Sequence, residues 1–139
     1  RSIGAGHSIA FQFNVAVSAV GAVSALDVLS SINESVPAVV SGKEVIVTLL
    51  GIADSRRITI SLTGVTGAVD SADAATSVGF LVGDLNSTRV VNASDISGVK
   101  AHLGQVLGPS NYQFDLNGDG LISPLDVSMV KARAGWKIP

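Results

Sequence analysis

Residues 115–126, DLNGDGLISPLD, place oxygen-bearing groups at the spacing of a calcium-binding loop. Calcium is a hard cation that takes about six to eight oxygen ligands, and a glycine at loop position six permits the sharp turn. Gly120 occupies that position. The candidate ligands at positions one, three, five, seven, nine and twelve are Asp115, Asn117, Asp119, the backbone carbonyl of Leu121, Ser123 and Asp126. The pattern predicts a calcium site; the alternative is a polar turn that binds nothing.

The same loop carries the signals that begin a helix. Ser123 is a favourable N-cap residue, Pro124 suits the first helical position, and Asp126 falls at the third. One carboxylate, Asp126, is therefore expected both to ligate the metal and to stabilise the start of the helix.

A second copy of this loop begins 31 residues upstream, and such an internal repeat is a strong signal. Its candidate ligands are Asp84, Asn86, Thr88, the carbonyl of Val90, Asn92 and Asp95. Thr88 replaces the acid at position five, and Arg89 replaces the glycine at position six. Because one carboxylate is lost and a positive charge is added, this copy is expected to bind calcium more weakly or not at all.

Two loop-then-helix units, each ending its ligand set in Asp and each followed by a Lys-Ala pair, resemble the dockerin type I domain. The resemblance covers about residues 83–139. It implies a pair of calcium loop-helix units, packed with pseudo-twofold symmetry, that docks onto a cohesin module of another extracellular protein. The cohesin contacts that it implies are Ala93, Ser94, Lys100, Ala101, Pro124, Leu125, Lys131 and Ala132.

The Ser-Thr pair of many cellulosomal dockerins is absent from these positions, which argues against a cellulosomal partner. The chain looks closer to the dockerin-like tails of large secreted bacterial proteins, in which an Ig-like repeat often precedes the dockerin. Trp136 is either a partner anchor or a cover for the core at the end of the chain.

Composition limits the other functions. A chain of 139 residues suits one domain or two small ones, and 47% hydrophobic residues are enough for real cores. A net charge of -2 favours neither nucleic acid nor an anionic membrane, and the lack of cysteine excludes disulfides and thiolate chemistry. No apolar stretch is long enough for a membrane span. A start at Arg1 is expected of a processed or cut fragment.

The first 82 residues show period-two alternation, which indicates β-strands. The expected strands are 8–18, 22–29, 36–40, 44–50, 57–63 and 77–82, with a polar loop at 70–74. We therefore expect an Ig-like antiparallel β-sandwich over residues 1–82 and the dockerin-like module over 83–139. Because an Ig-like sandwich usually needs seven strands, either the first strand is missing or the sandwich is complete with fewer.

The second part should contain two helices with apolar stripes at helical spacing. The first stripe is Ile96, Val99, Leu103 and Val106, with Gly108-Pro109 ending the helix. The second is Val127, Val130 and Ala134, with Gly135 at the end.

No catalytic group is expected. His7 and His102 lie far apart, the remaining acids are scattered, and there is no nucleophile elbow or phosphate loop. Asn33 is the only plausible glycan acceptor.

The sequence therefore predicts a non-catalytic, secreted or cell-surface bacterial module for calcium-dependent attachment to another extracellular protein, cohesin-like or a further copy of itself. The alternative is a structural subunit of a surface filament, packed through the same calcium-stabilised modules.

Overall fold

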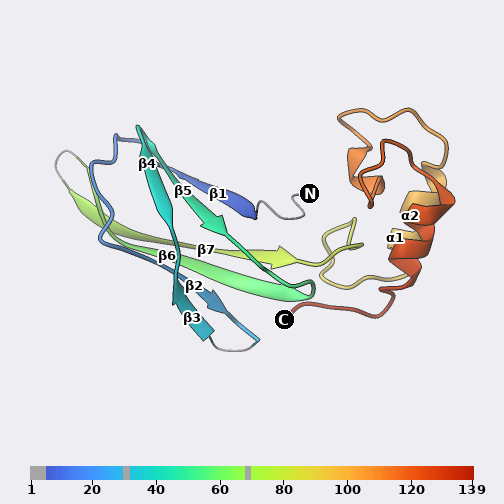
Figure 1. Cartoon of the computed structure of the whole chain (residues 1–139), viewed down its shortest axis with the longest axis horizontal. Coiled ribbons are helices and arrows are strands. Elements are labelled where there is room, and N and C mark those ends of the chain that lie inside the picture. Colours follow the sequence, from blue (N-terminus) through green and yellow to red (C-terminus); the bar gives the residue numbers. More distant parts are fainter. Residues whose placement is uncertain (1–5, 30–31, 68–69) are drawn as a thin grey trace. The chain divides into compact units, whose positions relative to one another are not determined.

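The computed structural model describes residues 6–29, 32–67 and 70–139 (Figure 1). In this part the chain is mainly β, with two antiparallel sheets followed by two short α-helices. It divides into two compact units, Ser2–Val78 and Gly79–Pro139, and each is described by itself. The boundary expected between residues 82 and 83 stays a prediction. None of the described helices is long and apolar enough to cross a membrane.

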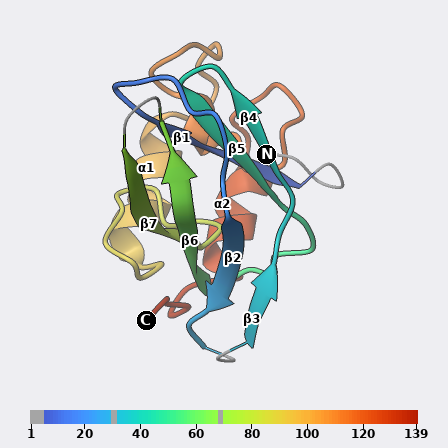
Figure 2. The same cartoon turned by 90° about the vertical axis from the view of Figure 1, so that its left-hand side faces the viewer.

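The strands of the first unit form a three-stranded and a four-stranded sheet (Figures 1 and 2). The three-stranded sheet has the order β1 (His7–Gln12), β5 (Glu44–Leu49), β4 (Ala38–Ser41). The four-stranded sheet has the order β3 (Ile32–Ser35), β2 (Ala22–Asp27), β6 (Arg56–Thr66), β7 (Ser71–Phe80).

The core of this unit comes from the alternating strands β5 and β6. Successive side chains of a strand point to opposite faces, so every second residue can be apolar and buried. The structure buries Val45, Val47 and Leu49 of β5, together with Ile58, Ile60 and Leu62 of β6. The alternation in the sequence thus correctly indicates which residues of both strands face the core.

The first strand is shorter than expected. β1 ends at Gln12, and the predicted continuation to residue 18 is wrong. The Val17 N–H donates to the Gly42 carbonyl at 2.9 Å, and the Ser18 N–H donates to the Thr66 carbonyl at 2.8 Å. Residues 13–18 therefore pass from one sheet to the other, and Val15, which lies within the expected strand 8–18, is 48% exposed.

Two further predictions in this unit are wrong. The chain forms a strand from residue 71, where a polar loop was expected, and the Asp73 carboxylate accepts a hydrogen bond from the Gly64 N–H at 2.8 Å. β3 was not predicted, because four residues with polar Asn and Glu show no useful alternation. The described residues form seven strands, where five or six were expected.

The second unit contains α1 (Ala93–Ala101), a short 3-10 helix (Tyr112–Phe114) and α2 (Pro124–Lys131). Its apolar core is built from both loops and both α-helices. The buried core residues are Val91, Val99, Leu116, Ile122, Val127 and Val130. The His102 ring stacks on Phe114, with ring centroids 3.9 Å apart, rather than lying free in solvent.

Both α-helices end earlier than their apolar stripes predicted. α1 stops at Ala101, which leaves Leu103 40% and Val106 92% exposed. Gly104 has φ +73°, and its N–H donates to the Ile122 carbonyl at 3.0 Å. This left-handed residue, and not Gly108-Pro109, turns the chain away from the helix axis. After α2, Ala134 is likewise exposed and lies outside the core.

Candidate metal centre

The second loop, residues 115–126, folds around its own polar side chains. The Asp115 carboxylate accepts hydrogen bonds from the N–H groups of Gly118 and Gly120, at 2.8 and 3.0 Å. Both glycines have positive φ, +73° and +93°, a conformation that a residue with a Cβ adopts at a cost. Asp119 accepts from the Leu121 N–H at 2.9 Å and from the Asn117 side-chain amide at 2.7 Å. These short-range bonds curl the loop and bring the side chains at positions one, three and five to its inside.

Asp126 closes the second loop from the start of α2. Its Oδ1 accepts from the N–H groups of Leu116 and Asn117, at 2.8 and 3.3 Å. Its Oδ2 accepts from the N–H and the hydroxyl of Ser123, at 2.8 and 3.1 Å. The Ser123 hydroxyl in turn accepts from the Leu125 N–H, which completes the predicted capping box.

The charge state of Asp126 follows from these contacts. Burial of the side chain, which is 0% exposed, by itself raises the pKa of the carboxyl group. The hydrogen bonds from Ser123, Leu116 and Asn117 act in the opposite direction and prevail, so they hold the pKa below its ordinary value. Asp126 is therefore a buried anion that the loop backbone stabilises.

The donor set of the second loop suits calcium in its chemistry, since it consists of oxygen atoms alone. Among the described residues, however, no three acidic or histidine side chains converge on one metal position. A carboxylate has about four lone-pair positions, and Asp126 uses four for hydrogen bonds within the protein. Asp115, Asn117 and Asp119 also take part in hydrogen bonds within the loop. Asp126 must give up one of its hydrogen bonds to ligate a cation.

The first loop, residues 84–95, repeats this backbone without its glycines. The Asp84 carboxylate accepts from the N–H groups of Thr88 and Arg89, at 3.0 and 2.8 Å. Asp95 is 1% exposed and accepts from the Leu85 and Asn92 N–H groups, at 2.8 and 2.9 Å. The positions of the two loop glycines are taken by Ser87 and Arg89, with φ +60° and +67°. Non-glycine residues in this region cost about 1–3 kcal/mol each, so the fold holds this loop in a strained shape.

Thr88 binds two candidate ligand atoms of the first loop itself. Its hydroxyl lies 2.6 Å from Asn86 Oδ1 and 3.2 Å from the Val90 carbonyl oxygen. These are the oxygens at loop positions three and seven. The Thr88 hydroxyl would therefore have to turn away before a cation could bind both oxygens. The inequality of the two loops expected from the sequence stays a prediction.

The two loops are joined by a symmetric exchange of hydrogen bonds. The Gly135 N–H donates to the Val91 carbonyl at 2.8 Å, as the Gly104 N–H does to the Ile122 carbonyl. The first loop is therefore linked to the segment after α2, and the second loop is linked to the segment after α1. The first loop has a further support, because its Val91 N–H donates to the Trp136 carbonyl at 2.9 Å.

The residues implied as partner contacts all lie on the surface of the second unit. They occupy the first and last turns of the two α-helices, or the positions just beyond them. The exposed residues are Ala93, Ser94, Lys100, Ala101, Pro124, Leu125, Lys131, Ala132 and Trp136. Trp136 is 45% exposed, and the Arg133 guanidinium lies 5.9 Å from the centre of its ring. Sequence reasoning did not identify Arg133, which comes to the indole only through the turn after α2.

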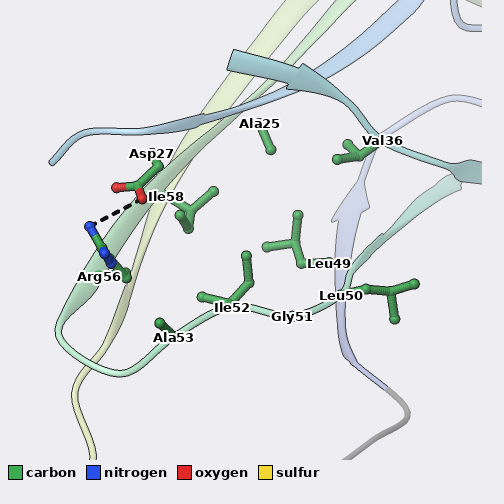
Figure 3. Close-up of a pocket in the computed structure, with 10 residues that line it drawn as sticks. All are labelled: Ala25, Asp27, Val36, Leu49, Leu50, Gly51, Ile52, Ala53, Arg56 and Ile58. Carbon is green, nitrogen blue, oxygen red and sulfur yellow. Dashed lines mark ion pairs between the residues drawn. The ribbon is translucent and has the colours of Figure 1, made fainter. Parts of the chain in front are cut away.

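The first unit contains a cavity of about 340 Å³ (Figure 3). Most of its lining residues have aliphatic side chains, and its two charged lining residues, Asp27 and Arg56, form an ion pair of 3.4 Å. The lining residues are Ala25, Asp27, Val36, Leu49, Leu50, Gly51, Ile52, Ala53, Arg56 and Ile58. The cavity therefore combines aliphatic side chains with an ion pair at one side.

Comparison with known proteins identifies the second unit alone. The family model of the dockerin type I domain matches residues 82–133. No curated protein matches the chain, and no solved structure matches it. The match confirms the resemblance for these residues, and the Ig-like repeat before them stays a prediction. Residues 82–133, which contain both loops and both α-helices, therefore carry the sequence of a dockerin type I domain.

Proposed function

We propose that residues 83–139 are a calcium-dependent attachment module that docks onto a cohesin-like module of another extracellular protein. The dockerin match over residues 82–133 supports this role, which is non-catalytic. The observation that carries the proposal is the placement of the nine candidate contact residues. All are exposed, and the start of each α-helix that presents them is fixed by one of the duplicated loops.

Calcium would be held in the second loop by Asp115, Asn117, Asp119, the Leu121 carbonyl, Ser123 and Asp126. When bound, it supplies positive charge to a loop that contains three carboxylates and opposes their mutual repulsion. The loop residues orient the ligand oxygens and cap α2, which fixes the direction of the helix surface.

The first loop would be the weaker site, with Asp84, Asn86, Thr88, the Val90 carbonyl, Asn92 and Asp95 as its ligands. Its backbone is supported by the chain end as well as by its own side chains. Its shape therefore depends less on metal than that of the second loop.

For residues 1–82 we propose an Ig-like sandwich. In the seven-stranded Ig arrangement one sheet has the order A-B-E-D and the other contains C, F and G, with C′ added beside C in variable-type domains. If β1 corresponds to strand B, then β2 to β7 correspond in chain order to C, C′, D, E, F and G. The observed sheets are then B-E-D and C′-C-F-G. Every observed neighbour then matches, and strand A has no counterpart among the residues that the structure describes. A secreted or cell-surface bacterial protein suits this pairing of modules.

The test is binding of the full chain to a panel of purified cohesin modules, in calcium and in chelator. Leu125 is 55% exposed at a predicted contact, and Val106 is 92% exposed outside the predicted surface. L125D should weaken docking by about tenfold or more, whereas the matched V106D should leave it unchanged. The proposal would be contradicted if the chain still bound a cohesin module in chelator or if L125D and V106D weakened binding equally. It would also be contradicted if the chain bound no cohesin module.

No finding supports the filament alternative.

A further inference from the structure

The repeat gives the second unit two helix surfaces that can be compared position by position. A shift of 31 residues carries each residue of the first copy onto its counterpart in the second, so Ser94 corresponds to Leu125 and Gln105 to Trp136. The Lys-Ala pair is the same in both copies. Where the backbone position is equal and the side chain differs, the difference shows which copy is better suited to bind a partner.

The two copies differ at the first turn of the helix. Ser94 and Leu125 are each the second residue of their helix, and each N–H donates to the N-cap side chain, at 2.8 and 3.2 Å. The local backbone is thus the same, yet Leu125 presents a large apolar side chain of which 55% is exposed. Burial of an exposed leucine in an interface is favourable, whereas a serine hydroxyl must find a new hydrogen bond when it loses water.

The segment after α1 uses its side chains to hold the connection between the two loops. The His102 ring stacks on Phe114, which directly precedes the second loop. Gln105 Oε1 accepts a hydrogen bond from the Asn111 side-chain amide at 3.4 Å, and its amide donates to the Ala101 carbonyl at 3.2 Å. In the first copy, these two positions are therefore engaged within the protein.

Their counterparts after α2 are Arg133 and Trp136, which lie beside each other. The guanidinium is 5.9 Å from the centre of the indole ring, within the range of a cation–π contact, and the indole is 45% exposed. Tryptophan and arginine are enriched among the residues that dominate binding at protein interfaces. Leu125, Ser128 and Ala132 follow one another at helical spacing and are all exposed, so one side of α2 extends from its first turn toward this pair.

Charge also distinguishes the second copy. All five acidic residues of the second unit belong to the two loops, where each accepts hydrogen bonds. Residues 127–139 contain three cations, Lys131, Arg133 and Lys137, and no acid, whereas the corresponding residues 96–108 contain one lysine and one histidine. A cationic surface with apolar anchors is complementary to a partner surface that combines apolar recesses with carboxylates.

We propose that the second copy leads the docking of this module. Leu125 and Trp136 enter apolar recesses of the cohesin-like partner, and Lys131 and Arg133 face carboxylates on its surface. The first copy, with Ser94 at the equivalent position, lies outside the main contact. This inference rests on the proposed function and adds to it the leading helix and the chemistry of the partner surface. It implies one orientation of the bound module, because exchanging the copies would put serine in the place of leucine.

Substitutions at equivalent positions of the two copies test the choice of helix. L125D and S94D are a matched pair, because each places an aspartate at the second position of a helix, where negative charge is favourable. The affinity of the full chain for a cohesin module that binds it would be measured in calcium by titration calorimetry. L125D should weaken docking by about tenfold or more, and S94D by less than about twofold.

A second matched pair tests the chemistry of the partner. Lys100 and Lys131 both lie in the last turn of their helix and are both exposed, so K100E and K131E change the charge in the same local setting. K131E should weaken docking by about tenfold or more, because it brings a carboxylate to an acidic partner surface, and K100E should have a much smaller effect. A K131E chain that docks like wild type contradicts the acidic partner surface.

The neutral variant L125S guards against misfolding of L125D, because it gives the second copy the side chain of the first. It should bind calcium like wild type and still dock at least about fivefold more weakly. If S94D and L125D bind the cohesin module with equal affinity, or if L125S docks like wild type, the inference is wrong. The proposed function, which is judged by calcium-dependent binding of the wild-type chain, stands in that case. A wild-type chain that binds no cohesin module overturns both.

Discussion

Replacing Asp126 by Ala should strongly destabilise the second unit, and this effect should be measurable in the absence of calcium. This carboxylate is both a candidate calcium ligand and the acceptor for the N–H groups of Leu116, Asn117 and Ser123. Its matched partner is Asp119, another candidate ligand, which is exposed and accepts hydrogen bonds from its near neighbours Asn117 and Leu121. Comparing D126A with D119A separates a structural role of the carboxylate from a role in metal binding.

The magnitude follows from the donors that D126A leaves without an acceptor. A buried donor without a partner costs about 1–3 kcal/mol, and the loss of a helix cap costs about 0.5–2 kcal/mol. Leu116 is only 4% exposed, whereas water can reach the partly buried Asn117 and Ser123. We therefore expect D126A to cost about 2–5 kcal/mol, against a total of about 3–9 kcal/mol for a unit of this size.

The assay is urea unfolding in chelator, followed by fluorescence of Trp136. This is the only tryptophan, and its carbonyl is hydrogen-bonded to Val91, so its signal reports on the second unit. D126A should be largely unfolded at low urea, and D119A should unfold almost like wild type. Calorimetry should show that both variants lose calcium binding at the second loop. If D126A and D119A unfold at the same urea concentration in chelator, the structural role assigned to Asp126 is wrong.

Three further predictions concern the same unit. Calorimetry of wild type should give one strong calcium site and one weak or silent site, and T88D combined with R89G should strengthen the weak one; two equal sites in wild type would contradict this. Deleting residues 136–139 should speed amide exchange at Val91 more than at Ile122, because the Val91 N–H donates to the Trp136 carbonyl; equal acceleration at both would refute the asymmetry. In chelator, the unit should be most stable at pH values above the ordinary pKa of an Asp carboxyl group. It should lose stability as the pH falls through the lowered pKa of Asp126, because the stabilising hydrogen bonds need the ionised carboxylate. A titration of the unfolding midpoint checks this, and a midpoint that rises on acidification would contradict it.

Local chemistry was enough to predict the candidate site. The oxygen-bearing side chains recur at fixed spacing within twelve-residue loops, and the capping box needs only Ser123 and Asp126, three positions apart. The residues of β5 and β6 that face the core could also be predicted, because alternation is a property of the strand itself. The dockerin match over residues 82–133 covers both of these loops.

The tertiary structure decided where those local patterns stop. Alternation continues past Gln12, yet hydrogen bonds to Gly42 and Thr66 draw the chain across to the other sheet. The apolar stripe of α1 continues to Val106, yet the bond from Gly104 to Ile122 ends the turn sooner and leaves Val106 in water. In each case the deciding partner lies far along the chain, so the local pattern could not contain it. For the same reason, only the folded loop shows that the lone pairs of Asp126 are already occupied by hydrogen bonds from the protein.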